Sequence, residues 1–284
     1  MDWLLFGAVL AFAVYTAYRV NDVLVYHWDW SRVAGFIVRR DNKTGHWFAN
    51  ILLLGLFSTL RLAWWGTVLA CIIGLIMGAC RASPNLTLRI ISRVYVELIR
   101  NIPAVVFIFV FYFFVSTQLF PLIGLNSRTV NVPWTDNAIF RALFGPPGLL
   151  TNFLSGLICL AMFEGAYITE IVRAGIQSVP KGQWEAARAI GLSRFNIQRD
   201  VILPQAVRKI LPPLAGQFIT LIKDSSIVSL ISIQELTYMG NEVANSTARV
   251  FETWIIVGVM YFAICYTFAV VFGRLESMAR RSHR

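Results

Sequence analysis

Long apolar runs alternate with short polar segments along this chain. The runs fall at residues 3–19, 50–80, 94–116, 149–172, 208–232 and 251–273. A helix needs about 20 mainly apolar residues to cross the hydrocarbon core of a bilayer. The pattern therefore predicts an all-α, polytopic membrane protein with about six transmembrane helices. The first run is the shortest, so a helix that lies along the membrane surface stays open there.

Composition agrees with this pattern and excludes other classes of protein. Of the 284 residues, 57% are hydrophobic and only 14% are charged, whereas soluble domains are roughly 25% charged. A soluble globular domain, a disordered chain and a nucleic-acid-binding domain are all excluded on that ground. The four cysteines lie in apolar runs and the three histidines are scattered, so we expect no metal site.

Lysine and arginine orient the predicted spans. Segments 81–93, 173–209 and 274–284 carry fourteen of these residues, while the alternating segments 117–148 and 233–250 carry three. Cytoplasmic loops of membrane proteins are rich in Lys and Arg, so the first group is expected in the cytoplasm. Segment 20–50 must then lie outside, although it contains Arg32, Arg39, Arg40 and Lys43. If the first run crosses the membrane, the amino terminus is cytoplasmic.

The cytoplasmic segment 173–209 contains a short polar helix. Residues 184–190 have strong helix formers, with Glu185 near the start, where the helix dipole favours an anion. Gly191 suits the left-handed residue that ends such a helix, and Pro204 restarts the chain towards the membrane. A short helix with an alanine face on the cytoplasmic surface can enter a groove in a partner.

The spacing in this segment resembles the signature loop of ABC-importer permeases. Glu185-Ala186-Ala187 is followed by three residues, Gly191, nine residues and Val201-Ile202-Leu203-Pro204. Val201 stands where the family usually has Ile. Segments 95–103, 166–176 and 221–226 also resemble the polar amino-acid uptake subfamily. The resemblance covers residues 50–275, leaving residues 1–49 as an amino-terminal helix with an extracytoplasmic segment and 276–284 as a basic cytoplasmic tail.

The resemblance implies a permease subunit of a binding-protein-dependent importer in the bacterial inner membrane. Its partners would be a second, identical or paralogous permease, an ATPase dimer and an extracytoplasmic solute-binding protein. The implied coupling residues are Glu185, Ala186, Ala187, Gly191, Leu203 and Pro204. The chain has no GxxxxGK[ST] run, the loop that holds nucleotide phosphates in P-loop proteins. We therefore expect no enzymatic activity and no cofactor in this chain, with ATP and Mg in the partner ATPase.

Charged residues inside the predicted spans are the candidates for a solute path. A carboxylate in the hydrocarbon core costs roughly 2.5–3.5 kcal/mol on insertion scales unless it has a partner or faces water. Glu164 is such a carboxylate, and it can bind a solute amino group, bind a basic side chain or form a salt bridge to another helix. Lys223 and Asp224 are adjacent, so they need different partners or a local break in the helix. Together with Ser225 and Ser226, they are read either as a solute path or as a helix-packing network.

Two charged pairs lie nearer the cytoplasmic ends of the spans. Glu97 and Arg100, and likewise Glu170 and Arg173, are three residues apart, a spacing that places both partners on one helix face. We interpret both pairs as structural, with a gate as the alternative for Glu97 and Arg100. Pro103 removes a backbone hydrogen bond and is expected to bend the third span.

Two other functional classes remain as alternatives. A membrane enzyme would need converging catalytic groups, and no HxxxxD, HExxH, DDxxD or GxSxG pattern occurs. A proton-coupled secondary transporter of amino acids or other small polar solutes could use Lys223 and Asp224, but it would not require the loop around Glu185. The sequence leaves open which amino acid is carried and which subunit holds the solute site.

Overall fold

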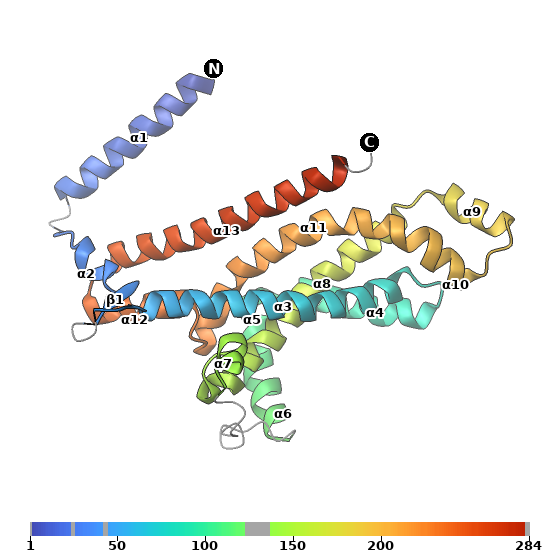
Figure 1. The fold of residues 1–284 in the computed structure, drawn as a ribbon, viewed down its shortest axis with the longest axis horizontal. Helices are drawn as coiled ribbons and strands as arrows, with labels where there is room; N and C mark the ends of the chain where they lie inside the picture. Colours follow the sequence, from blue (N-terminus) through green and yellow to red (C-terminus); the bar gives the residue numbers. More distant parts are fainter. Residues whose placement is uncertain (1, 24–25, 42–44, 123–136, 282–284) are drawn as a thin grey trace.

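The computed structural model describes residues 2–23, 26–41, 45–122 and 137–281. Within these ranges the regular secondary structure is helical apart from one short hairpin (Figure 1). Lys43, Arg128 and Arg284, which were part of the charge pattern, lie outside the described residues.

The first helix of the chain stands apart, whereas the segment after it packs against the helical body. Helix α1 (Asp2–Val23) stands apart from the other helices (Figure 1), and its described side chains are exposed. Helix α2 (Trp30–Ala34) and the antiparallel strands β1 (Val38–Arg40) and β2 (Trp47–Ala49) then lead into the first long helix. Arg39 pairs with Phe48 across the hairpin, and both are exposed.

Five helical segments are long and apolar enough to cross a membrane. They are Ile51–Ala82, Ala104–Leu122, Ala138–Gln177, Arg194–Ile231 and Val250–Met278. In the described residues a shorter apolar helix, Trp3–Thr16, precedes them. The structure thus has five candidate spans plus the amino-terminal helix, in agreement with the predicted class of all-α membrane protein.

The third predicted span, 94–116, had the wrong start. Helix α4 (Leu86–Arg100) ends before Pro103, and a second helix begins at Ala104. This second helix comprises α5 (Ala104–Val110), the π-helical turn η1 (Phe111–Ser116) and α6 (Thr117–Leu122). Proline has no N–H to donate and disfavours a helical residue before it, so the chain breaks here rather than merely bending. Residues 94–100 belong to the separate helix α4.

The predicted span 208–232 also began too late. The helix starts at Arg194 and runs through α10 (Arg194–Asn196), the π-helical turn η4 (Ile197–Ile202), α11 (Leu203–Asp224) and the 3-10 segment η5 (Ser225–Ile231). The Leu203 N–H donates to the carbonyl of Gln198, five residues back. Pro204 cannot donate to the preceding turn, and the wider π turn lets the helix continue through it.

Helices α3 (Ile51–Ala82) and α8 (Leu150–Gln177) form the centre of the molecule. Gly74 and Gly78 of α3 lie against Ile168 and Val172 of α8, which lets the two backbones approach closely. Short elements complete the chain: α7 (Ala138–Phe144), η3 (Pro147–Leu149), α9 (Lys181–Ala189) and α12 (Leu236–Thr247), followed by the long α13 (Val250–Arg281).

The segments rich in Lys and Arg lie at one end of the molecule. Figure 1 shows α4, α9 and α10 at one end, and α2, β1 and α12 at the other. The first end carries the Lys- and Arg-rich segments 81–93 and 173–209. By the positive-inside rule it is the cytoplasmic end.

Candidate functional site

Helix α9 occupies the tip of the cytoplasmic end. It runs from Lys181 to Ala189, so it begins three residues earlier than the predicted 184–190, with Pro180 fixing its entry. Gly191 follows with φ +81°. The expected left-handed residue after the helix is therefore confirmed. The Gly191 N–H donates to the Arg188 carbonyl and the Leu192 N–H to the Ala187 carbonyl, which ends the helix.

One face of α9 is fixed to the body and the other is free in this chain. Ala187 is buried and belongs to an apolar cluster with Ile197 and Ile202 of η4. Glu185 and Ala186 are exposed. Two large apolar side chains nearby are also exposed, Ile190 at 76% and Phe195 at 69%. Leu203 and Pro204 are exposed on the neighbouring helix α11 rather than on α9 itself.

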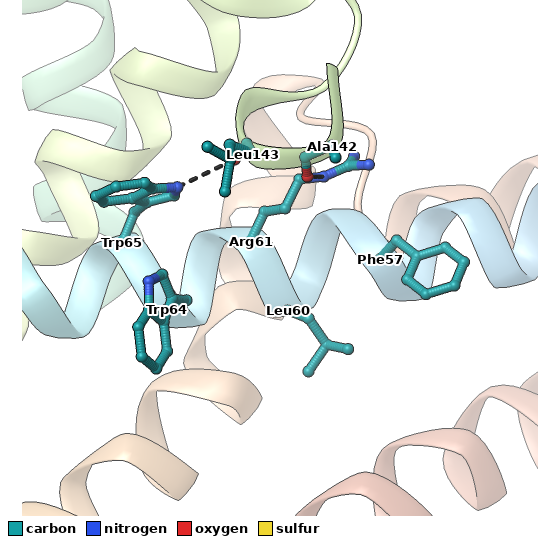
Figure 2. A pocket seen from close by; sticks show the side chains of 7 residues that line it. All are labelled: Phe57, Leu60, Arg61, Trp64, Trp65, Ala142 and Leu143. Carbon is teal, nitrogen blue, oxygen red and sulfur yellow. Dashed lines mark hydrogen bonds between the residues drawn. The ribbon is translucent and has the colours of Figure 1, made fainter. Parts of the chain in front are cut away.

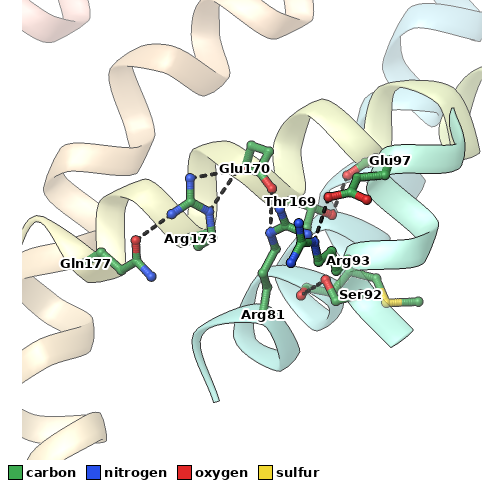
Figure 3. A network of polar contacts seen from close by, with 10 residues as sticks. Arg81, Ser92, Arg93, Glu97, Thr169, Glu170, Arg173 and Gln177 are labelled. Atoms are coloured by element: carbon green, nitrogen blue, oxygen red, sulfur yellow. Dashed lines mark hydrogen bonds and ion pairs between the residues drawn. The ribbon is translucent and has the colours of Figure 1, made fainter. Parts of the chain in front are cut away.

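A polar network ties α3 to α8 just inside this end (Figure 3). The Glu170 carboxylate lies 2.7 Å from Arg81 Nε of α3 and 2.8 Å from Arg173 of its own helix. Arg173 also donates to Gln177. Glu170 and Arg173 thus form the pair expected from their spacing, and Arg81 joins it from another helix.

Glu97 and Arg100 do not form the expected pair. Glu97 accepts a 2.7 Å hydrogen bond from Arg93, one turn earlier on α4. The Arg100 guanidinium lies over the ring of Tyr167 on α8, 5.0 Å from its centroid. Both spacings put a cation on the same helix face as Glu97, so spacing alone could not choose between them.

Glu164 lies in the middle of α8 and is fully buried. One carboxylate oxygen accepts a hydrogen bond from Gln217 of α11. The other oxygen has no hydrogen-bond partner among the described residues, and Asp224 of α11 is close enough to interact with the carboxyl group. Within the same part of the chain no ion pair involves Glu164, so the alternative of a salt bridge to another helix is not realised there. The sequence reading did not single out Gln217 because a neutral amide carries no charge signal.

Lys223 and Asp224 differ in how far their side chains are exposed. Lys223 is exposed and Asp224 is half-buried. The helix changes from α to 3-10 form at Ser225, which is the local break expected from two adjacent charges. Ser225 Oγ donates to the Ile222 carbonyl and Ser229 Oγ to the Ser226 carbonyl, so these hydroxyls occupy backbone acceptors at the break. Of the two residues, Asp224 is the one that interacts with Glu164.

Two further buried carboxylates lie at the opposite end and were missed. Glu235 caps α12 through the Tyr238 N–H at 2.8 Å and accepts from Tyr261 of α13 at 2.6 Å and from Thr59 of α3 at 3.3 Å. Burial raises the pKa of Glu235, and these hydrogen bonds lower it in part. Glu235 lies between the predicted spans, outside the apolar pattern that drew attention to Glu164.

Glu252 at the start of α13 holds the amino-terminal segment. It accepts from the Tyr26 hydroxyl and, at 2.8 Å, from the Asp29 N–H. Arg249 lies over the Tyr26 ring and donates to the His27 carbonyl. Tyr26 and Asp29 are more than 220 residues away from Glu252 in sequence, so no local sequence pattern indicates these contacts.

The structure thus has a helical body with five candidate membrane spans and a short exposed helix at its cytoplasmic tip, the arrangement expected of a transporter permease. Residues 70–281 match the family described as binding-protein-dependent transport system inner membrane component, and the chain belongs to this family. It is therefore a multi-pass inner-membrane protein and an ABC-importer permease, as the motif around Glu185 predicts.

Two curated relatives and one solved structure show which permeases this chain is similar to. The chain is 34% identical over 235 residues to the probable glutamine ABC transporter permease GlnM of Bacillus subtilis, covering 80% of this chain and 96% of GlnM. It is 31% identical to the glutamate/aspartate import permease GltJ of Escherichia coli, covering 80% of this chain and 86% of GltJ. A crystal structure of an amino acid ABC transporter with histidines matches with a TM-score of 0.65 and 31% identity, covering 80% of this chain and 94% of that one.

Proposed function

We propose that this chain is the permease subunit of an ATP-driven, binding-protein-dependent importer of amino acids. The observation that carries the proposal is the exposed helix α9, which presents Glu185 and Ala186 at the cytoplasmic tip while Ala187 fixes it to η4. An ATPase subunit that receives α9 in a groove would drive this chain. Permease relatives whose names specify glutamine and glutamate/aspartate support the class of solute.

Hydrogen bonds and a long helix connect α9 with the middle of the membrane. Gln205 of α11 donates to Gln183 of α9 at 3.2 Å, and Lys209 of α11 donates at 2.7 Å to the carbonyl of Ser178, which ends α8 just before α9. From Arg194 the helix continues to Ile231. Movement of α9 with its ATPase partner would therefore reach Gln217 and Asp224 as a rigid-body displacement, which is a common basis for switching between two states.

The tentative solute path consists of Glu164, Lys223, Asp224, Ser225 and Ser226, to which the structure adds Gln217. The unpaired oxygen of Glu164 and the carboxylate of Asp224 are suited to the ammonium group of an amino acid. Broken helices near the membrane centre are frequent sites in transporters, and the change to 3-10 form at Ser225 is such a break.

The remaining components are supplied by other chains. We infer a second permease subunit, an ATPase dimer that binds ATP and Mg, and an extracytoplasmic solute-binding protein. This chain itself is expected to hydrolyse no nucleotide when purified alone.

Glu185→Ala and Gly191→Asp test the docking proposal. Glu185→Ala removes the exposed carboxylate of α9, and Gly191→Asp places a side chain at a left-handed residue, which strains the end of the helix. Both variants should lose most ATP-dependent uptake and co-purify with less ATPase, while membrane insertion is unchanged. Glu242→Ala, an exposed carboxylate on α12 at the opposite end, is the matched control and should transport normally.

Normal uptake in both α9 variants would contradict docking at this helix. Uptake that survives ATP depletion and collapses with the proton gradient would instead favour a secondary transporter.

A further inference from the structure

A pocket of about 430 Å³ lies between α3 and α7 (Figure 2). Its lining consists of Phe57, Leu60, Arg61, Trp64 and Trp65 of α3 with Ala142 and Leu143 of α7. Arg61 is the single charged side chain in this lining. The pocket is therefore apolar with a cation at its edge.

Arg61 is held in place by backbone contacts. Its Nε donates to the Ala142 carbonyl at 2.7 Å, and the neighbouring Trp65 Nε1 donates to the Leu143 carbonyl at 3.0 Å. Figure 2 shows the guanidinium directed towards α7. No carboxylate pairs with Arg61 in the described parts of the chain. A guanidinium has five N–H donors, so most of them remain available to an anion.

The depth of Arg61 places it within reach of lipid headgroups. It lies ten residues into α3, or about 15 Å from the extracytoplasmic start of the helix at 1.5 Å per residue. The 32 residues of α3 span roughly 48 Å, against a hydrocarbon core of about 30 Å. If α3 is centred, Arg61 therefore lies only about 6 Å below the outer edge of that core. Arginine side chains at this depth extend to the interface.

The apolar part of the pocket faces away from the protein core. Trp64 is 60% exposed and Phe57 43% exposed in this chain. Both side chains belong to a membrane-spanning helix, and lipid tails are the surrounding medium at that depth. By the same arithmetic as for Arg61, Trp64 lies about 10 Å below the outer edge of the core, at the level of the acyl chains.

We propose that this pocket binds a phospholipid of the outer leaflet, with its phosphate on the Arg61 guanidinium and an acyl chain along Phe57, Leu60 and Trp64. A cation beside an apolar surface matches a molecule with an anionic head and an apolar tail. Because the lining comes from both helices, the lipid holds α7 against α3. The inference rests on the membrane orientation of α3 and is independent of the solute carried.

The test measures lipid retained by the full-length chain. Protein reconstituted in vesicles of phosphatidylglycerol and phosphatidylethanolamine is extracted in mild detergent, and bound lipid is counted by native mass spectrometry. Arg61→Gln should reduce retained phospholipid by about tenfold, because a charge-assisted hydrogen bond is lost. Arg61→Lys should retain more than Arg61→Gln. Arg93→Gln, which removes an exposed cation at the cytoplasmic end, is the matched control and should retain the parental amount.

Trp64→Ala is the second, independent variant. Its side chain is mostly exposed, so truncation should leave the fold intact while weakening the contact with the acyl chain. If Arg61→Gln fails to fold, the comparison of Trp64→Ala with the parent decides the proposal.

Unchanged lipid retention in folded Arg61→Gln, or in Trp64→Ala when Arg61→Gln does not fold, would overturn the proposal. Dissociation of permease subunits in Arg61→Gln without loss of lipid would also overturn it, because the pocket would then be a contact between subunits. If millimolar inorganic phosphate displaces the lipid and Trp64→Ala has no effect, the site recognises an anion alone and the proposal again fails.

Discussion

At the scale of single residues, three glutamates with no exposed surface divide into two kinds. Glu235 accepts hydrogen bonds from three other elements of the described chain, and Glu252 accepts two from the amino-terminal segment. Glu164 keeps one oxygen without a hydrogen-bond partner in the same described ranges. Buried polar groups are normally satisfied in a folded protein. The first two carboxylates are therefore explained as structural. Glu164 has only Gln217 and the neighbouring Asp224 carboxyl as polar contacts in the described residues, and it is the one that we propose for the solute path.

Substitution of Glu164 tests this distinction. Glu164→Ala should lower the uptake rate at low solute concentration by about tenfold or more, because a charge-assisted hydrogen bond to the solute is lost. Glu164→Gln keeps the shape and should have an intermediate effect. Initial uptake of labelled amino acid is the measurement, with thermal melting as the check on folding. Glu97→Gln, which disturbs only an exposed surface pair, should be unaffected. Parental uptake by folded Glu164→Ala would remove Glu164 from the solute path.

At the scale of helices, the contact between α3 and α8 depends on glycines. A Cβ at Gly74 would lie 2.6 Å from Cβ of Ile168 and 3.1 Å from its backbone carbon. Gly74→Ala should therefore destabilise the chain by about 1–3 kcal/mol through overpacking, seen as a lower melting temperature in detergent. Gly273→Ala in α13 meets nothing within 4 Å and should be neutral or slightly stabilising. Equal melting temperatures for the two variants would show that the α3–α8 contact is looser than described.

The sequence predicted helices better than it predicted their breaks. Apolar run length identified five spans and the amino-terminal helix because hydrophobicity is summed over about 20 residues. The break at Pro103 and the π turn before Pro204 depend on which backbone hydrogen bond is lost and how the chain recovers it. Contacts between segments distant in sequence could not be predicted either. Gln217 binds Glu164 across 53 residues, and Glu252 binds Tyr26 across 226.

At the scale of the whole molecule, the amino-terminal segment conflicts with the charge rule that orients the rest. Arg32, Arg39 and Arg40 are exposed, and the contacts of Glu252 with Tyr26 and Asp29 fix this segment at the start of α13. That end carries α12 and lies opposite α9 (Figure 1). We therefore expect the segment on the extracytoplasmic side in spite of its basic residues, whether α1 crosses the membrane or lies along its surface.

Impermeant thiol labelling distinguishes this orientation from its alternatives. Ser31→Cys in the exposed α2 should react with an impermeant maleimide in intact cells, whereas Gly182→Cys in α9 should react only after permeabilisation. Both positions are exposed in this chain, and expression without the ATPase keeps α9 uncovered, so accessibility from one side of the membrane is the difference tested. The four native cysteines set the background, which is subtracted using the parent chain. If Ser31→Cys is labelled only after permeabilisation, the segment lies in the cytoplasm and the predicted orientation is wrong. Its contact with Glu252 could then not form in the membrane, because α13 begins on the other side.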